Sequence, residues 1–215
     1  QRELCIRRNK SLFSQNSLLV QKKFKDAGFE PLVRPELEEF IQKDIFSSYY
    51  KINNRIDVKK YIPFYPLAEK QEPLIVHPVT SRGAKGTSFI LEAINKLKQK
   101  YDFEFLLIED SEHEKVMQQL SKADIVIDQL ILGAFGTTSL EGMALGKPTV
   151  CYLTEELLRK LPAIPLINAN PDTICSVLET LLTNPEIKNE IGKKSQKYIE
   201  ENHDADKIAN QLKEI

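Results

Sequence analysis

One stretch near the middle of the chain decides the fold: residues 123–152 read ADIVIDQLILGAFGTTSLEGMALGKPTVCY. It opens and closes with short, apolar, β-branched runs at 125–127 and 149–152, which have the character of strands buried on two faces. Between these runs lie a glycine-containing loop and a short segment with helical patterning. A strand, a loop, a helix and a second strand form the repeating unit of a parallel sheet.

The same alternation continues on both sides of this stretch. Further apolar strand patterns lie at 74–76, 103–108 and 164–167. Helix-period stripes fill the gaps between them, and two amphipathic closing helices are expected after Pro185. We therefore predict an α/β protein, a Rossmann-like parallel sheet with helices on both faces, preceded by a short, mainly helical N-terminal segment.

The patterning divides the chain into three parts. Residues 1–60 lack strand runs and are expected to form a partial N-terminal or interdomain segment, with helices at 17–27 and from Pro35 onward. Prolines make 61–72 a linker, because they oppose regular structure. Residues 73–215 are expected to form the Rossmann-like domain together with its closing helices.

The composition limits the possible functions. With 215 residues, of which 41% are hydrophobic, the chain can bury one ordinary core. The 30 basic and 31 acidic side chains give a net charge of −1, so no global field favours nucleic acid or an acidic membrane surface. An anion site must therefore be local.

Cysteine usage and hydropathy indicate the cellular compartment of the protein. The 3 cysteines are odd in number and lack metal-ligand spacing, which favours a reducing environment. No apolar stretch reaches the ~20 residues that a membrane-spanning helix needs, and no signal segment opens the chain. We expect a cytoplasmic protein without a transmembrane segment. Because the chain begins at Gln1 rather than Met, we also expect that sequence is missing upstream.

The first candidate site is the loop after the strand pattern at 74–76. Residues 77–87 read HPVTSRGAKGT, with Gly83 and Gly86 beside the cations Arg82 and Lys85. Glycines let backbone amides approach an anion, and a helix N-terminus with two full charges suits a diphosphate. The alternative is a plain turn with two solvated cations. The spacing matches neither a Walker A loop nor a G-x-G-x-x-G loop, which makes ATP and NAD poorer candidates.

The second candidate site follows the strand pattern at 125–127. Gly136, Thr137 and Thr138 are expected at a helix N-terminus, where amides can bind phosphate, and Glu141 follows in the first turn. A carboxylate there can accept hydrogen bonds from the two vicinal hydroxyls of a ribose. The alternative is a capping box, because Thr138 and Glu141 have its spacing.

Both loops together resemble the C-terminal domain of glycosyltransferase family 4, which has the GT-B fold. The likeness lies in His-Pro-x-x-x-Arg-x-x-Lys-Gly-Thr at 77–87 and Phe-Gly-x-x-x-Leu-Glu-x-Met-Ala-x-Gly-x-Pro at 135–148. The resemblance implies that residues 73–215 bind a nucleotide-sugar donor. It further implies that Arg82 and Lys85 hold the donor diphosphate and are catalytic, that the amides of Gly136, Thr137 and Thr138 assist, and that Glu141 binds the ribose.

One departure from the family concerns the sugar. The family commonly has a second glutamate before the position of Glu141, with seven residues between the two, and this chain has Gly133 there. Gly133 is therefore a candidate sugar-contact position without a carboxylate, which puts sugar choice and catalytic strength in question. His113 falls near the family's base-binding region, with an exposed first-turn residue as the alternative. His77 follows the apolar run of a buried strand. Its side chain is expected either to be a hydrogen-bonded structural histidine or to line the donor site.

The resemblance implies a metal-independent, hexosyltransferase-type retaining enzyme with no cofactor, in which the nucleotide-diphosphate sugar is a substrate. The acceptor is a hydroxyl of a glycan or lipid-linked glycan, as in polysaccharide or glycoconjugate biosynthesis. The acceptor is bound through an N-terminal domain that is missing or partial here, and peripheral membrane attachment of the full-length enzyme is left open. No nucleic-acid partner is expected. Two alternatives remain: a non-catalytic nucleotide-sugar-binding or partner-supporting module, and a GT-B nucleotide-sugar epimerase.

Overall fold

The computed structural model describes residues 16–67, 72–161 and 163–214. Packing of the backbone divides the chain into two compact units, one formed by Gln1–Arg55 with Asp206–Ile215 and the other by Ile56–Ala205. The second unit carries both candidate loops. Cys5 lies outside the described residues.

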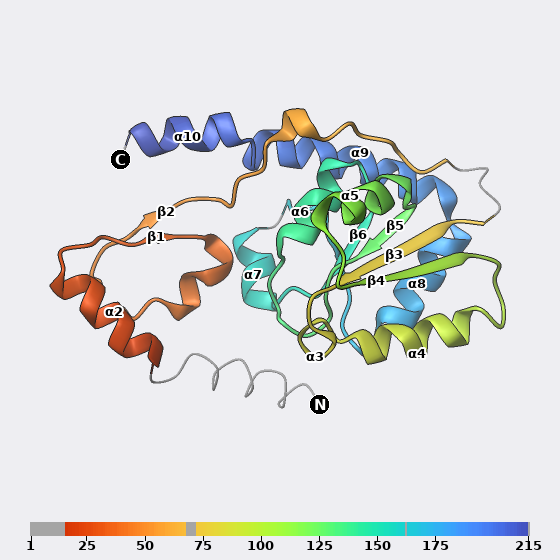
Figure 1. The fold of residues 1–215 in the computed structure, drawn as a ribbon, viewed down its shortest axis with the longest axis horizontal. Coiled ribbons are helices and arrows are strands. Elements are labelled where there is room, and N and C mark those ends of the chain that lie inside the picture. The colour runs from red at the N-terminus through yellow and green to blue at the C-terminus, as the bar shows by residue number, and fades with distance from the viewer. Residues whose placement is uncertain (1–15, 68–71, 162, 215) are drawn as a thin grey trace. The chain divides into compact units, whose positions relative to one another are not determined.

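The larger unit is built around a five-stranded parallel sheet, which confirms the predicted fold class (Figure 1). Its strand order is β4-β3-β5-β6-β7. The strands are β3 (Leu74–Val79), β4 (Glu104–Glu109), β5 (Ile125–Ile127), β6 (Thr149–Cys151) and β7 (Ile167–Asn168). The helices and turns of this unit are η2 (Val58–Lys60), α3 (Arg82–Lys85), α4 (Thr87–Leu97), α5 (His113–Lys122), α6 (Thr137–Ala144), α7 (Glu155–Lys160), α8 (Ile174–Thr183) and α9 (Pro185–Asn202).

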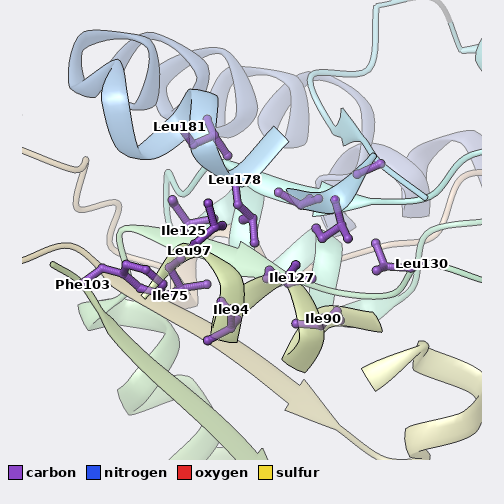
Figure 2. Packing of buried hydrophobic residues seen from close by; sticks show 14 residues of the cluster. Ile75, Ile90, Ile94, Leu97, Phe103, Ile125, Ile127, Leu130, Leu178 and Leu181 are labelled. Atoms are coloured by element: carbon purple, nitrogen blue, oxygen red, sulfur yellow. The ribbon is translucent and has the colours of Figure 1, made fainter. Parts of the chain in front are cut away.

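The alternation of side chains along the central strands supplies both faces of the sheet. Ile75 pairs in register with Ile125, and Val76 pairs with Val126. Successive residues of a strand point to opposite faces, so each face receives one buried β-branched pair. The isoleucine face packs against α4 and α8, whose apolar stripes include Ile90 and Leu178 (Figure 2).

The opposite face is covered by a different set of helices. Val76 and Val126 pack there with Leu120 of α5 and with Leu145 directly after α6. A neighbouring cluster buries Leu140 and Met143 of α6, Leu157 of α7 and Ile199 of α9. Helices on both faces hold the sheet in the middle layer and leave its carboxyl edge to the loops that follow the strands.

The segment that we predicted to be a linker packs on this unit over its described part. Residues 61–67 have no regular secondary structure. Phe64 N donates to Leu145 O at 3.0 Å, and the fully buried Lys147 donates from Nζ to Phe64 O. Tyr65 lies against Gly146, where an added Cβ would come within 2.7 Å of the ring. The segment therefore packs against the turn that follows the C-terminus of α6.

The smaller unit combines short helical and extended pieces. It contains α2 (Asn16–Asp26), β1 (Leu32–Val33), the 3₁₀ helix η1 (Pro35–Phe40), β2 (Tyr50–Lys51) and α10 (Ala205–Lys213), whose first residue belongs to the larger unit. The helices expected at 17–27 and after Pro35 are present as α2 and η1. Gly28 follows α2 with φ +79°, as a left-handed cap requires. The parallel pair β1 and β2 was not predicted, because two-residue strands are too short to show alternation.

Candidate functional site

The two candidate loops leave the sheet at the same place. The chain goes from β3 outward to β4 on one side and then returns to β5 on the other side of β3. Residues 80–86 follow β3 and residues 128–136 follow β5, so both lie at the carboxyl edge on either side of this reversal. In open α/β sheets, ligands bind in this position, because the loops diverge there and leave room between them.

The two glycines of the first loop have different roles. Gly86 joins α3 to α4 with φ +71°, and an added Cβ would lie 3.0 Å from Ile131 Cγ1. The fold therefore requires glycine at this turn. Gly83 lies within α3, has no positive φ, and has nothing within 4 Å of an added Cβ. Its lack of a side chain has no structural cause within the described chain.

Arg82 is exposed and engaged with a carboxylate. Its Nε donates to Glu109 Oε1 at 2.7 Å, and Nη2 donates to Glu109 Oε2 at 2.5 Å. This two-point hydrogen bond raises the pKa of Arg82 and lowers the pKa of Glu109. Glu109 is the last residue of β4, so Arg82 spans from the loop after β3 to the neighbouring strand end.

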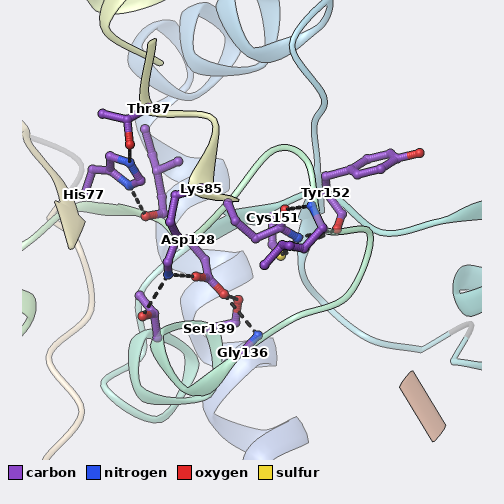
Figure 3. A network of polar contacts seen from close by, with 12 residues as sticks. His77, Lys85, Thr87, Asp128, Gly136, Ser139, Cys151 and Tyr152 are labelled. Carbon is purple, nitrogen blue, oxygen red and sulfur yellow. Dashed lines mark hydrogen bonds and ion pairs between the residues drawn. The ribbon is translucent and has the colours of Figure 1, made fainter. Parts of the chain in front are cut away.

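Lys85 is held inside the site (Figure 3). Its ammonium forms an ion pair with Asp128, the residue that follows β5, and lies 3.4 Å from Thr138 Oγ1. The side chain of Lys85 is only 12% exposed, and that of Asp128 is 1% exposed. The pair thus joins the loop after β3 to the start of α6 at low exposure, where an ion pair is weakly screened.

The N-terminus of α6 is organised by the same carboxylate. Gly136 is the N-cap residue, and its N–H donates to Asp128 Oδ2 at 3.1 Å. Ser139 Oγ donates to the same oxygen at 2.6 Å. The amides of Thr137 and Thr138 are in the first turn, where an α-helix offers no intrahelical acceptor. Of the predicted diphosphate residues, the structure brings together Lys85, Gly136 and Thr138.

Glu141 does not close a capping box with Thr138. The N-cap of α6 is Gly136, and Glu141 Oε1 lies 2.6 Å from Nε2 of His113 on α5. Tyr61 also forms a side-chain hydrogen bond with Glu141. Burial, reinforced by the negative charge of Glu141, raises the pKa of Tyr61 to about 12. The buried carboxylate of Glu141 is therefore directed at polar groups outside its own helix.

His113 and His77 have contrasting environments. The side chain of His113 is 69% exposed at the first position of α5, as the exposed alternative for this residue predicted. His77 is completely buried: Nδ1 donates to Ile127 O at 2.9 Å, and Nε2 accepts from the Thr87 hydroxyl at 3.1 Å. Burial lowers the pKa of His77 to about 4, so the ring is neutral. His77 is a structural histidine that joins β3, β5 and α4.

Gly133 has a backbone conformation that disfavours any side chain. Its φ is +78°, and an added Cβ would lie 2.7 Å from Thr154 Cγ2. Thr154 N donates to Gly133 O at 3.0 Å, and the Thr154 hydroxyl caps α7 by accepting from Leu157 N. The loop around Gly133 is thus fitted to glycine, and a glutamate could not be placed there without rearrangement.

Two residues to which the sequence reasoning assigned no role shape the loop after β5. The Gln129 side chain accepts from Ile131 N and Leu132 N, both at 2.7 Å, and donates to Ala134 O at 2.9 Å. Asp128 joins Lys85 to the α6 N-terminus, as described above. Their position directly after a buried strand, at the carboxyl edge of a parallel sheet, was the signal that could have singled them out.

Two further properties concern the described residues as a whole. None of the helices in 16–67, 72–161 and 163–214 is long and apolar enough to cross a membrane. Over these same ranges, no group of three or more His, Cys, Asp or Glu side chains is arranged to hold a metal ion.

Comparisons with known proteins give structural neighbours only. No model of a protein family matches the sequence, and no curated protein matches it. Sucrose-phosphate synthase from Thermosynechococcus elongatus aligns with 95% of this chain and 62% of its own, with a TM-score of 0.68 and 18% identity. A mutant of TarM from S. aureus, in complex with Fondaparinux, alpha-GlcNAc-glycerol and UDP, covers 85% of this chain and 43% of its own, at TM-score 0.62 and 14% identity.

A third neighbour is the alpha-glucosyltransferase AGT in complex with UDP, which covers 78% of this chain and 57% of its own, at TM-score 0.57 and 13% identity. The present chain thus spans less than two thirds of the length of the structures it matches. At these identities the likeness is one of fold. The five-stranded parallel sheet and its flanking helices match the Rossmann-like C-terminal domain of the GT-B fold.

Proposed function

We propose that this chain supplies the donor-binding half of a retaining glycosyltransferase. The enzyme transfers a hexosyl group from a nucleotide-diphosphate sugar to a hydroxyl of a glycan or lipid-linked acceptor, in polysaccharide or glycoconjugate biosynthesis. One observation carries the proposal: Lys85 and the N-terminus of α6 meet at the reversal between β3 and β5. The fold shared with UDP-containing glycosyltransferase structures adds support.

The proposed chemistry is electrostatic. Departure of the nucleoside diphosphate develops negative charge on its terminal phosphoryl oxygens. Arg82, Lys85 and the amides of Thr137 and Thr138 are fixed donors that stabilise this charge without the reorganisation that water needs, whereas the Gly136 N–H is held by Asp128. Arg82 exchanges Glu109 for a phosphate oxygen when the donor binds, and its guanidinium fork suits carboxylate and phosphate oxygens alike. No metal ion is required in this scheme.

Recognition of the nucleoside is assigned to Glu141 and His113. Glu141 is buried on α6, and its carboxylate can accept from both hydroxyls of a ribose. His113 contacts one of its oxygens. The ribose displaces this exposed imidazole, which then lies beside the nucleoside.

The backbone at Gly133 favours a second candidate function, a nucleotide-sugar-binding module without chemistry. No carboxylate stands at this position, and the left-handed conformation opposes one. The two candidates differ in turnover and agree in donor binding. Incubation of the chain with a bound nucleotide sugar and soluble hydroxyl acceptors, followed by NMR of the product anomer, separates them. A product with retained configuration supports the transferase, and its absence when the chain is tested as part of the full-length protein supports the module.

The proposed donor site is tested first by calorimetric titration. UDP, GDP, ADP and their sugar conjugates are added to the chain and to the variants Arg82→Ala and Glu141→Gln. Removal of either contact should weaken the one nucleotide that binds by about tenfold or more, the loss typical of a hydrogen bond to a charged group. Lys96→Ala is the matched control, because Lys96 forms an exposed ion pair with Glu92 on α4. If none of these nucleotides binds to the folded chain, the proposal is wrong.

A further inference from the structure

The Asp128 side chain joins the two loops of the candidate site (Figure 3). Its Oδ1 pairs with the Lys85 ammonium, and its Oδ2 accepts from Gly136 N at 3.1 Å and from Ser139 Oγ at 2.6 Å. The side chain is 1% exposed. One buried carboxylate therefore ties a cation from the first loop to the opening turn of α6.

Lys85 is fixed at both of its ends. Its carbonyl oxygen accepts from Leu130 N at 3.0 Å, and its ammonium is held by Asp128. A lysine ammonium carries three N–H donors. Asp128 takes one donor, and Thr138 Oγ1 at 3.4 Å is positioned for another. The geometry leaves one donor for a ligand oxygen near the first turn of α6.

The direction of α6 indicates which phosphoryl group meets this donor. Glu141, the proposed ribose contact, lies three residues further along the helix than Thr138, a rise of about 4.5 Å. A nucleotide whose ribose binds Glu141 extends its phosphates towards the N-terminus of α6. The distal phosphoryl group is the one that reaches Lys85.

We propose that Asp128 is a positioning residue that fixes the Lys85 ammonium against the N-terminus of α6, so that the site recognises the distal phosphoryl group of a nucleoside diphosphate. This inference rests on the proposed donor-binding function. A lysine whose rotamers are already restricted loses less conformational entropy when it binds, which gives a fixed cation an advantage over a mobile one. Asp128 thereby makes the site selective for diphosphate over monophosphate.

A plain counter-charge would behave in the opposite way. If Asp128 only balanced Lys85, its removal would leave an unopposed cation, and every phosphate ligand would bind more tightly. If Asp128 positions Lys85, its removal weakens the diphosphate selectively. Asp128→Asn separates the two cases, because an amide has one acceptor oxygen and cannot serve Lys85 on one side and both Gly136 N and Ser139 Oγ on the other.

The experiment measures two dissociation constants for each protein by calorimetry. The ligands are whichever of UDP, GDP and ADP binds the unchanged chain, and its monophosphate. For Asp128→Asn we expect the diphosphate to bind about tenfold more weakly and the monophosphate to change by less than about threefold. Asp124→Asn is the matched control, because Asp124 is a buried carboxylate directly before β5, at the opposite end of that strand from Asp128, where it accepts from Leu74 N at 2.7 Å. It should leave the ratio of the monophosphate dissociation constant to the diphosphate dissociation constant unchanged.

Asp128→Glu is the second variant, and it keeps the charge while moving it by one methylene. Positioning predicts a reduced ratio for this variant too, whereas a counter-charge predicts an unchanged one. Thermal unfolding identifies a variant that fails to fold, and the remaining variant then decides. Tighter binding of both ligands by Asp128→Asn, or an unchanged ratio in the folded variants, overturns the inference alone. Absence of nucleotide binding by the unchanged chain overturns the proposed function with it.

Discussion

At the residue scale, each predicted phosphate-binding cation is paired with a carboxylate. Lys85 has the buried Asp128, and Arg82 has Glu109 at the exposed end of β4. The two carboxylates act differently on a ligand. Asp128 restricts Lys85 and leaves one ammonium donor unused, whereas Glu109 occupies the face of Arg82 that a phosphate would need.

Glu109→Gln should therefore strengthen nucleotide binding. The substitution removes the charge that competes for Arg82, and we expect the nucleoside diphosphate to bind about two- to fivefold more tightly, as befits an exposed ion pair. Calorimetry measures the change. Glu104→Gln is the matched control, because Glu104 is an exposed residue at the opposite end of the same strand. Weaker binding by Glu109→Gln would show that Glu109 holds Arg82 in its binding position.

His77 should make the larger unit sensitive to mild acid. Its pKa falls from an ordinary 6.5 to about 4 in the folded chain, chiefly through burial. The folded state thus binds its proton less readily than the unfolded state. The stabilising contribution is complete above pH 6.5 and is lost as the pH falls through about 4, to a total of about 3 kcal/mol.

His77→Gln tests this expectation by urea unfolding at pH 7, 5.5 and 4.5. Glutamine can both donate and accept, but it does not titrate. The free energy of unfolding of the variant should fall less steeply between pH 7 and 4.5 than that of the unchanged protein. Because the acidic side chains are the same in both proteins, their titration cancels in the comparison. If the free energies of unfolding of the two proteins depend on pH in the same way, His77 is not the cause of the acid sensitivity.

The sequence alone left the role of Glu141 ambiguous. Its spacing from Thr138 fits a capping box as well as a ligand contact. The decision depends on where α6 begins, and the start at Gly136 turns Glu141 towards His113. A threonine and a glutamate three positions apart do not fix where the helix begins, so the pattern alone could not distinguish the two roles.

At the element scale, the loop after β5 is defined by side-chain hydrogen bonds and one left-handed glycine. The Gln129 side chain fixes the backbone of the loop, because it forms hydrogen bonds with backbone groups of Ile131, Leu132 and Ala134. Gly133 completes the turn against Thr154. These contacts join the loop to the N-terminus of α7 as well as to the sheet.

Gly133→Ala should destabilise the chain by about 2 kcal/mol or more. Part of the cost is the positive φ, and part is the close approach of the new Cβ to Thr154 Cγ2. Thr154→Ser removes this methyl group and keeps the hydroxyl that caps α7. In the Thr154→Ser background, Gly133→Ala should cost only about 1–2 kcal/mol. Urea unfolding of the four proteins measures the coupling.

Gly83→Ala is the control for this series. Gly83 has an ordinary helical backbone and open space around an added Cβ, so its substitution should change stability by less than about 0.5 kcal/mol. Equal costs of Gly133→Ala in the unchanged chain and in the Thr154→Ser background would show that the methyl contact relaxes freely.

The strands show why some elements were predictable from sequence. The strand at 125–127 was predicted with its observed bounds, because it is buried on both faces and all three residues are β-branched. The pattern at 164–167 was apolar too, yet the strand is Ile167–Asn168. Ile164 and Leu166 pack in the cluster around α6 and α7 before the strand begins. Burial outside a sheet gives the same sequence signal as burial within one.

At the scale of the whole molecule, the candidate site depends on strand order. Lys85 and Asp128 are 43 residues apart, and they meet because β3 and β5 are neighbours although β4 lies between them in the chain. The motifs singled out the two candidate loops, and the alternation predicted the parallel sheet that is observed. The pairing of side chains across the loops required the order and register of strands, which depend on packing of the entire unit.

Nucleotide binding should slow amide hydrogen exchange within Ile56–Ala205 and leave α2 unaffected. All proposed contacts lie in the larger unit, and a ligand at 100 times its dissociation constant stabilises the state it binds by about 2.7 kcal/mol. Hydrogen-exchange mass spectrometry with and without the nucleotide that binds measures the effect, and inosine serves as a ligand without phosphate. Equal protection of α2 would show that the two units unfold together.

The left-handed backbone at Gly133 also constrains how this sequence can diverge over time. A carboxylate at position 133 is most costly while Thr154 retains its methyl group, and less costly once that threonine has been replaced by serine. The order of substitutions therefore matters, since neighbouring changes of this kind are not additive. The positive φ adds its own cost along either route. A single substitution of Gly133 by a larger residue is therefore disfavoured, and the cost falls only after Thr154 has lost its methyl group.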